Sequence, residues 1–379
     1  FVSKIDPRGV KIWDKFLGSS AAYDNGQAVA VDGSGKVYVV GGSGANWGSP
    51  ARAHSGNGMD AFVAILNSDG NLLWSTFMGT RGNFDFARAV TINADGHLFV
   101  AGDSDADWGW AITKKRHSGS RDFFALKMTS TGVVFWHTFM GSSDWDSCRD
   151  MARDINGNIY LSGSSSGEWG VPRNGYSGVG DAMVVKLNGN GDYQWHTFLG
   201  SGAYDIAQSI ATDTTGNVYI SGASKSSWGT PLRAYQGQSD GFVAKLNSAG
   251  NRLWNTFMGS TGRDEALGMT VDGRGNIYVT GWSSASWGNP QNPFNDANDA
   301  FVAQLNPSGV RRWHTFLGGT GNDGADDITS NGAGNIVIAG SSAATWGAPV
   351  TAHRGDWDVF AAKLRTGTAL PPFLLLLND

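Results

Sequence analysis

Six tryptophans suited to ligand binding recur at a nearly constant spacing along the chain. Each is followed by glycine, and neighbouring copies lie 59 or 61 residues apart: Trp47, Trp108, Trp169, Trp228, Trp287 and Trp346. Several of the same loops add an arginine or a second ring: Arg52, Arg173, Arg233, Tyr176 and Tyr235. An indole stacks on the C–H face of a sugar while arginine donates to hydroxyls, and both residue types also dominate protein interfaces. The loops are therefore candidate sites for binding a glycan or another protein.

The regularity of the pattern also favours a structural role. A ligand site need not persist in every copy of a repeat, whereas a residue that holds the repeat together must. Tryptophan and glycine persist in all six copies, while the arginines and second rings vary. We therefore expect the indoles to pack between repeats, with ligand binding as the alternative for the same residues.

Two aspartates recur together with the tryptophans. One lies in the loop that leads into the first strand-like run of each copy: Asp24, Asp85, Asp146, Asp205, Asp264 and Asp323. Another opens the third run: Asp60, Asp122, Asp181, Asp240, Asp299 and Asp358. We expect these carboxylates to accept hydrogen bonds from buried loop amides. We expect no metal or other cofactor, and a calcium ion between two converging aspartates is the alternative.

The second copy is the least regular. Its loop reads "DWGWAITKKRHSG", from Asp107 to Gly119, and concentrates the cations Lys114, Lys115 and Arg116. A solvated basic loop explains this run, and a docking site for an acidic or sulfated partner is the sharper interpretation.

Catalytic motifs are weak throughout. "GSSSG", residues 163–167, matches a nucleophile pattern, but that pattern needs a strand-to-helix turn, and its Ser165 is a serine found in every copy. His137, His196 and His314 follow the second recurring tryptophan at a position that other copies fill with Asp, Ser or Asn. Cys148 is the single cysteine, so the chain cannot form an intramolecular disulfide. We expect a protein without enzymatic activity, and a hydrolase or lyase with an unrecognised channel site is the alternative.

Each copy divides into four short runs with strand character. In the fourth copy these are "QSIATD", "NVYISGAS", "DGFVAKLN" and "NRLWNTFMG", separated by Gly, Asn, Asp and Ser. Alternating apolar and polar residues with such breaks indicate β-strands, and four antiparallel strands repeated every 40 to 60 residues are typical of propeller blades. The sequence predicts an all-β, six-bladed β-propeller of four-stranded antiparallel blades. A seven-bladed or incompletely closed ring is the alternative.

The two ends of the chain compete for one position in this ring. We predict one propeller domain over residues 1–379, in which strands within 1–17 close the ring, 18–366 form the repeat units and 367–379 form a tail. The apolar segment Phe373–Leu377 is suited to the same outer position. If it takes that position, the N-terminal strands cap an edge, belong to a seventh blade or pair with another molecule.

The repeat resembles a known family. The motifs D-[AG]-F-V-A-K-L-N, W-x-T-F-[LM]-G, D-G-x-G-N-[IV]-Y-V and G-x-S-x-x-x-W-G together resemble the bacterial beta-propeller repeat called SBBP. The resemblance covers nearly the whole chain and implies a secreted or surface-displayed bacterial protein, with no shared chemistry.

The composition of the chain excludes some classes of partner. A net charge of −5 gives no attraction for nucleic acid or anionic lipid, and no apolar run reaches the ~18 residues of a membrane helix. The absence of an initiator Met at Phe1 suggests a processed precursor or a trimmed chain. We expect a secreted or cell-surface scaffold that binds protein subunits, surface polymers or glycans through the face that carries the Trp-Gly loops. A lectin-like propeller with sites at blade junctions is the alternative, and self-assembly through the terminal strands is a further expectation.

Overall fold

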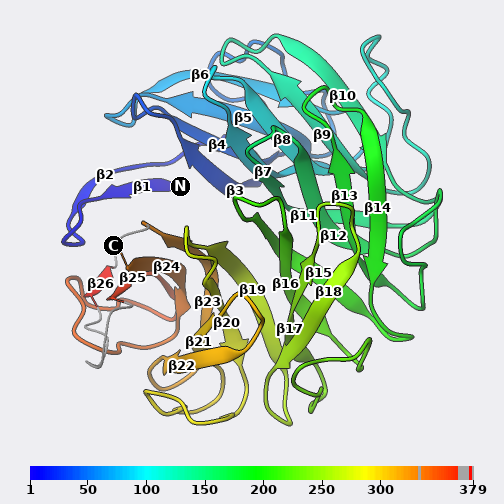
Figure 1. Ribbon diagram of the computed structural model, residues 1–379. Helices are drawn as coiled ribbons and strands as arrows, with labels where there is room; N and C mark the ends of the chain where they lie inside the picture. The colour runs from blue at the N-terminus through cyan, green and yellow to red at the C-terminus, as the bar shows by residue number, and fades with distance from the viewer. Residues whose placement is uncertain (332–333, 366–374, 378–379) are drawn as a thin grey trace. The chain divides into compact units, whose positions relative to one another are not determined.

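The computed structural model describes residues 1–331, 334–365 and 375–377. These residues form 26 strands and no helix, and 24 of the strands make six four-stranded antiparallel sheets (Figure 1). Each sheet uses four strands that are consecutive in sequence, joined by short turns and loops. The fold is therefore an all-β, six-bladed propeller, and the prediction from the repeat is confirmed.

The sheets are numbered as blades in chain order. Blade 1 contains β3 (Asp24–Val31), β4 (Val37–Ser43), β5 (Asp60–Leu66) and β6 (Leu72–Met78). Blade 2 contains β7 (Asp85–Ile92), β8 (Leu98–Ser104), β9 (Asp122–Met128) and β10 (Val134–Met140). Blade 3 contains β11 (Asp146–Arg153), β12 (Ile159–Ser165), β13 (Asp181–Leu187) and β14 (Tyr193–Leu199).

The remaining three blades repeat this order. Blade 4 contains β15 (Asp205–Thr212), β16 (Val218–Ser224), β17 (Asp240–Leu246) and β18 (Arg252–Met258). Blade 5 contains β19 (Asp264–Val271), β20 (Ile277–Ser283), β21 (Asp299–Leu305) and β22 (Arg311–Leu317). Blade 6 contains β23 (Asp323–Ser330), β24 (Asn335–Ser342), β25 (Asp358–Arg365) and β26 (Leu375–Leu377).

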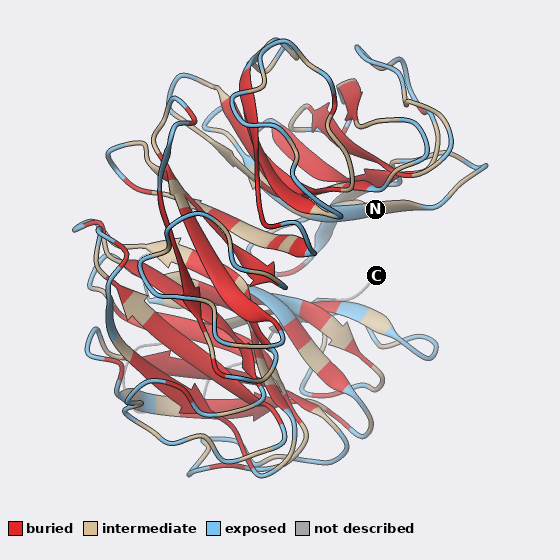
Figure 2. Ribbon diagram, turned by 90° about the vertical axis from the view of Figure 1, so that its right-hand side faces the viewer, coloured by how far each residue is buried: buried red, intermediate tan, exposed pale blue. Residues whose placement is uncertain are grey.

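The chain divides into two compact units. One holds residues 1–4, 12–176 and 183–197, and the other holds 5–11, 177–182 and 198–379. Within each unit the first strand of a blade packs across the sheet before it: β7 contacts β3, β4 and β5, and β19 contacts β15, β16 and β17. Buried residues follow the strands, and exposed residues follow the connections (Figure 2). Apolar side chains of neighbouring blades, such as Val63 and Phe124, share one core.

Every pairing of a first with a second strand contains a β-bulge. In blade 3, Cys148 pairs with Gly163 and Asp150 with Ser162, so Arg149 between them has no partner in the ladder. The same shift leaves one residue unpaired in each of the other blades: Gln27, Arg88, Gln208, Leu267 and Asp326. A bulge adds one residue to a strand and increases its local twist.

The N-terminal strands occupy a different position from the one expected. The outer strand of blade 6 is β26, where Leu377 pairs with Ala361, while β1 (Val2–Ile5) and β2 (Lys11–Lys15) pair only with each other. The prediction that residues 1–17 supply that outer strand is therefore wrong. The rest of the predicted tail, residues 367–374 and 378–379, lies outside the described residues.

The β1–β2 hairpin packs against blade 1. Val2 and Trp13 pack on the core cluster of that blade, which contains Phe62. The indole N–H of Trp13 donates to Ser68 O at 3.1 Å, as that of Trp74 in blade 1 donates to Ser130 O of blade 2 at 2.5 Å. The hairpin thus contacts blade 1 as the outer strands of one blade contact the next.

No helix in the part of the chain that the structure describes is long and apolar enough to cross a membrane.

Candidate functional site

Five of the six Trp-Gly indoles are buried in the blades. Their exposed fractions range from 4 to 8%: Trp47, Trp108, Trp228, Trp287 and Trp346. Each packs against one or two phenylalanines of its own blade, as Trp47 does against Phe62 and Phe77 with ring centres 5.2 and 5.6 Å away. Burial removes these five from the candidate ligand-binding residues. The expected packing role holds, although the rings lie on their own sheet rather than only between repeats.

Trp169 of blade 3 is the exception, because it is only partly buried. In blades 4 and 5 an arginine at the start of the outer strand covers the indole: Arg252 lies 5.5 Å from Trp228, and Arg311 lies 4.9 Å from Trp287. In blade 3 the same position holds Tyr193, which opens β14. A shorter, rigid ring in place of a long arginine leaves part of the indole uncovered.

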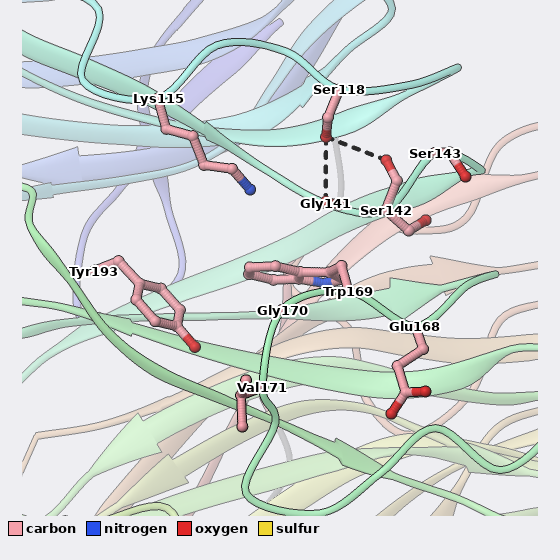
Figure 3. Close-up of a pocket in the computed structure, with 10 residues that line it drawn as sticks. All are labelled: Lys115, Ser118, Gly141, Ser142, Ser143, Glu168, Trp169, Gly170, Val171 and Tyr193. Carbon is pink, nitrogen blue, oxygen red and sulfur yellow. Dashed lines mark hydrogen bonds between the residues drawn. The ribbon is translucent and has the colours of Figure 1, made fainter.

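The uncovered indole lines an open hollow of about 560 Å³ (Figure 3). His196 covers one face of Trp169, with the two rings stacked 3.8 Å apart and only 5° from parallel. Tyr193 lies beside the indole, and its hydroxyl hydrogen-bonds His196 Nδ1 at 2.7 Å. The other side chains at the hollow include Lys115, Ser118, Ser142, Ser143, Glu168 and Val171.

Lys115 is the cation that faces this hollow. Its Nζ lies 4.6 Å from the centre of the Trp169 ring. Partial desolvation lowers the pKa of Lys115, and the Asp122 and Asp146 carboxylates act against that lowering. A cation held over the face of an indole is attracted by the ring quadrupole, a contact worth about 0.5–2 kcal/mol.

The other predicted binding residues do not meet at this site. Lys114 pairs with Asp192 at 2.5 Å, and Arg116 pairs with Asp107 at 2.8 Å. Within the basic run, two of the three charges are thus already paired.

Arg52 lies over Trp110 at 4.2 Å, and Arg233 donates to the carbonyls of Phe257 and Gly259. Tyr235 packs edge-on against Phe257 at 5.5 Å. Arg173 is exposed, and its backbone N–H donates to His196 O at 2.8 Å. Tyr176 is partly buried in the same loop. Of the predicted residues, only Trp169 and Lys115 come together in one hollow.

The three histidines of the outer strands are structural. His137, His196 and His314 are almost completely buried beneath the Trp-Gly loops. His314 Nε2 hydrogen-bonds Trp287 O at 2.6 Å, and Asn255 uses its amide nitrogen for the equivalent bond to Trp228 O. Burial lowers the pKa of each histidine to about 4. They are therefore neutral near pH 7 and serve as polar supports for the loops.

The recurring aspartates bind loop amides, which confirms that prediction. In all six copies, both aspartates accept a backbone N–H from a residue four or five positions earlier. For example, Asp146 Oδ2 accepts from Ser142 N at 2.7 Å, and Asp122 Oδ2 accepts from Ser118 N at 2.8 Å. The carboxylates thus fix the loops that form the floor of the Trp169 hollow.

The two aspartate series converge in pairs at the junctions between consecutive blades. A Cβ added to Gly141, the last residue of the W-x-T-F-[LM]-G motif, would lie 2.6 Å from Asp122 Oδ1 and 2.5 Å from Asp146 Oδ2. The same glycine separates Asp60 from Asp85, Asp181 from Asp205, Asp240 from Asp264, and Asp299 from Asp323. Glycine recurs in this motif because two carboxylates occupy the space that a side chain would need.

Several acids of these pairs hold a proton to a higher pH than a free carboxylic acid does. Burial, with the neighbouring carboxylate adding to it, raises the pKa of Asp85 to about 7 and that of Asp299 to about 6. One buried oxygen of Asp122, Asp181, Asp240 and Asp299 has no hydrogen-bond partner. The Ser342 hydroxyl lies within hydrogen-bond distance of both Ala344 O and Asp323 Oδ1, so its single proton satisfies only one of them unless Asp323 carries another.

A calcium ion at each aspartate pair would need further ligands besides the two carboxylates. Among the described residues, no three His, Cys, Asp or Glu side chains are grouped to hold a metal ion. Calcium prefers six to eight oxygen ligands, usually with several carboxylates. The raised pKa values of acids such as Asp85 and Asp299 favour protonation as the way in which such pairs are neutralised.

Asp299→Asn is expected to make blades 5 and 6 less sensitive to alkali. The folded pKa of Asp299 lies above the unfolded value of about 4, so its stabilising contribution is present at low pH and lost as pH rises through 6. The asparagine does not titrate, so the variant should gain about 2–3 kcal/mol relative to the parent between pH 4 and pH 8. Urea unfolding at several pH values measures this difference.

Asp272→Asn is the matched control. Burial alone would raise the pKa of Asp272, but hydrogen bonds from Asn276, Arg274 and Tyr278 outweigh burial and lower it. This variant should lose stability at neutral pH, with no gain as pH rises. Parallel pH profiles for Asp299→Asn and the parent would show that the pair is not protonated.

Sequence comparison missed one set of exposed rings. The residue before the first-strand aspartate is aromatic and exposed in four copies: Tyr23, Phe84, Trp145 and Tyr204. Isolated β-bridges join this position to the loop before the third strand, as between Trp145 and Arg121, so the two loop sets lie on one side of each junction. The ring next to a recurring aspartate was the available signal.

Three segments of the chain match the family model of a known repeat. The family model for the SBBP beta-propeller repeat matches residues 136–168, 194–227 and 259–286. An uncharacterized WD repeat-containing protein, L264, of Acanthamoeba polyphaga mimivirus is 22% identical over 267 residues, which are 56% of this chain and 19% of that protein. The regulatory protein FlaEY of Caulobacter vibrioides is 26% identical over 206 residues, covering 51% of this chain and 22% of FlaEY. The chain thus matches about a fifth of the length of these relatives.

Among solved structures, the WD40 domain of Neurospora crassa Pan2 is similar with a TM-score of 0.50 at 8% identity. The match covers 93% of this chain and 79% of that domain. At this identity the likeness concerns the fold alone.

Proposed function

This chain is built from beta-propeller repeats of the SBBP type, and on that premise we propose that it is a non-catalytic binding scaffold whose recognition site is the Trp169 hollow. The observation that carries the proposal is that one of six equivalent indoles is uncovered, and that it lies at a hollow with hydroxyl and charged side chains. An indole beside such groups suits a saccharide, whose C–H faces stack and whose hydroxyls hydrogen-bond.

The hydroxyls of the hollow support binding rather than catalysis. The Ser118 and Ser142 hydroxyls donate to Asp122 and Asp146 at 3.0 and 2.9 Å. Burial raises the pKa of the Tyr193 hydroxyl. The Asp122 and Asp146 carboxylates also accept loop N–H groups, so we take the two serines as donors that hold the loops in place. Incubation of the purified protein with the saccharides it binds, followed by product analysis, tests this part of the proposal, and turnover would overturn it.

Secretion or display on a bacterial surface is the location that we propose for this scaffold, in line with the resemblance of its repeats. Its partners there are surface glycans, with protein subunits as the second candidate. The exposed rings Tyr23, Phe84 and Trp145 favour that second candidate, because aromatic residues are enriched at protein interfaces. Fractionation of cells that make the full-length protein tests the location.

Trp169→Ala is expected to weaken saccharide binding by at least about tenfold, because it removes the stacking surface of the hollow. The measurement is a glycan array with the parent protein, followed by calorimetry of the variant with the saccharides that bind. Unfolding curves establish that the variant is folded, and Trp169→Phe, which keeps a ring, should retain part of the affinity.

Trp357→Ala is the control variant. Trp357 is 55% exposed and does not line the hollow, so its removal tests whether any exposed tryptophan matters. Equal losses in both variants would contradict the assignment of the site. An array on which the parent binds no saccharide would contradict the saccharide as ligand.

A further inference from the structure

We infer that the Trp169 hollow takes an acidic saccharide, whose carboxylate or sulfate group is bound by Lys115. The inference rests on the proposed function and adds the charge of the ligand. It follows from the pairing of the basic run, from an internal comparison of the blades, and from the arrangement of side chains in Figure 3.

Lys115 is the cation of the basic run that has no carboxylate partner. Its neighbours Lys114 and Arg116 each form an ion pair shorter than 3 Å. In the part of the chain that the structure describes, no such pair involves Lys115, whose Nζ instead lies over Trp169. Of the three charges, Lys115 alone is therefore placed at the hollow and free to bind an anion.

Blade 4 shows the same position in a closed form. The backbone N–H groups of Phe139 and Phe257 donate to Lys115 O and Arg233 O, which makes the two cations equivalent. Arg233 donates to Gly259 O at 2.9 Å and to Gln236 Oε1 at 3.1 Å, and it lies 5.7 Å from the buried Trp287. Its donors are thus already used within the fold.

Among the described residues no carbonyl anchors the Lys115 ammonium in this way, and the indole beneath it is only partly buried. Compared with the junction of blades 4 and 5, the junction of blades 2 and 3 has Lys115 in place of Arg233 and Tyr193 in place of Arg311. These two replacements open the hollow at that junction. A flexible ammonium with three donors can move from the indole to an incoming anion at little cost. Arg233 thus shows this cation with its donors used within the fold, and Lys115 shows it with donors available to a ligand.

The acids below the hollow do not neutralise this cation directly. Asp122 and Asp146 are completely buried under Gly141 and Ser142, and loop amides hydrogen-bond both. A ligand in the hollow therefore meets Lys115 rather than the carboxylate pair. Burial also raises the pKa of Asp146 to about 6, so this pair holds part of a proton under mildly acidic conditions.

The remaining groups match a sugar rather than a simple anion. Lys115 and Glu168 lie on opposite sides of Trp169, so an acidic group at one end and hydroxyls at the other can both be satisfied (Figure 3). The exposed Ser143 and the Glu168 carboxylate can bond hydroxyls, while Trp169 and Val171 offer apolar surface. A volume of about 560 Å³ lies within the range of small-molecule sites.

The test uses trigalacturonate and its trimethyl ester as a pair of probes that differ in charge and by three methyl groups, with a heparin tetrasaccharide as the sulfated probe. Calorimetry should show binding of at least one acidic probe, and the ester should bind at least about tenfold more weakly than the free acid if carboxylate is the recognised group. Lys115→Gln should weaken the acidic probe by a similar factor and weaken a neutral trisaccharide much less.

Lys114→Gln and Arg116→Gln are the matched controls, because each removes the same charge from an adjacent residue that is already paired. Equal losses in all three variants would overturn the inference, since general surface charge would then explain binding. Equal binding of a hexaglutamate peptide would overturn the saccharide. Binding of neutral saccharides alone, lost in Trp169→Ala, would overturn only the acidic ligand and leave the proposed function standing.

Discussion

Gly79→Ala is expected to destabilise the protein by about 3 kcal/mol or to prevent folding, because two buried carboxylates occupy the space of the new methyl group. The added Cβ would lie 2.6 Å from both Asp60 Oδ1 and Asp85 Oδ2. Neither aspartate can move away cheaply, since Ser55 N donates to Asp60 and Thr80 N donates to Asp85. The backbone of Gly79 does not have a positive φ, so the cost is steric rather than conformational.

Chemical unfolding of Gly79→Ala beside Gly33→Ala measures this effect. Gly33 has an ordinary φ and no atom within 4 Å of an added Cβ, so its variant should unfold like the parent. Adding Asp60→Ala to Gly79→Ala should cost less than the sum of the two single changes, because the smaller side chain makes room for the methyl group. If Gly79→Ala does not fold, Gly318→Ala provides the same test between Asp299 and Asp323. Unchanged stability in both would refute the pairing of carboxylates.

His314→Asn is expected to protect the protein from acid. The folded pKa of His314 is about 4, lowered by burial and by the nearby Arg311, while an unfolded histidine titrates near 6.5. The unfolded chain therefore binds the proton first, so this contribution to stability is present above pH 6.5 and is lost as pH falls to 4. Over that window the parent should lose about 3 kcal/mol that the asparagine variant does not lose.

Asparagine is a suitable replacement because Asn255 already occupies the equivalent position in blade 4, where its amide donates to Trp228 O at 3.0 Å. Near pH 8 the variant should be about 1 kcal/mol less stable, since the ring stacked on Trp287 is lost. Asn255→His is the reciprocal variant and should introduce acid sensitivity. The readout is the free energy of unfolding in urea from pH 4 to pH 8, and a constant difference between parent and variant would disprove a neutral buried histidine.

These histidines and the aspartate pairs act in opposite directions over the same range of pH. Protonation destabilises the outer strands through His137, His196 and His314, and deprotonation destabilises the junctions through acids such as Asp85. Single replacements are needed to see either effect, because the two slopes offset each other in the parent.

The fold could be predicted from the sequence because every strand carries its own signal. Alternation of side chains within β16 or β17, with glycine at the turns, is local and repeats six times. The position of β1 and β2 could not be predicted, since the choice between them and β26 depends on pairing between ends of the chain that are far apart in sequence.

The site could be predicted only in part. Trp169 and Lys115 were among the candidates, but nothing near Trp169 in sequence distinguishes it from the five buried indoles. Tyr193 lies beside it, 24 residues later, at the position where blades 4 and 5 carry the covering arginine. Each recurring aspartate series could be recognised in the sequence. The pairing of the two series across glycines such as Gly141 could not, because it depends on how two blades pack side by side.

The bulge in each first strand gives the protein a place where chemistry can change without cost to the sheet. The unpaired position holds Gln27, Arg88, Arg149, Gln208, Leu267 and Asp326 in the six blades, so amide, cation, aliphatic chain and acid are all accepted there. A residue outside the ladder has no cross-strand neighbour that it must match. These six positions are therefore the first choice for introducing new side chains by substitution without changing the pairing of the strands.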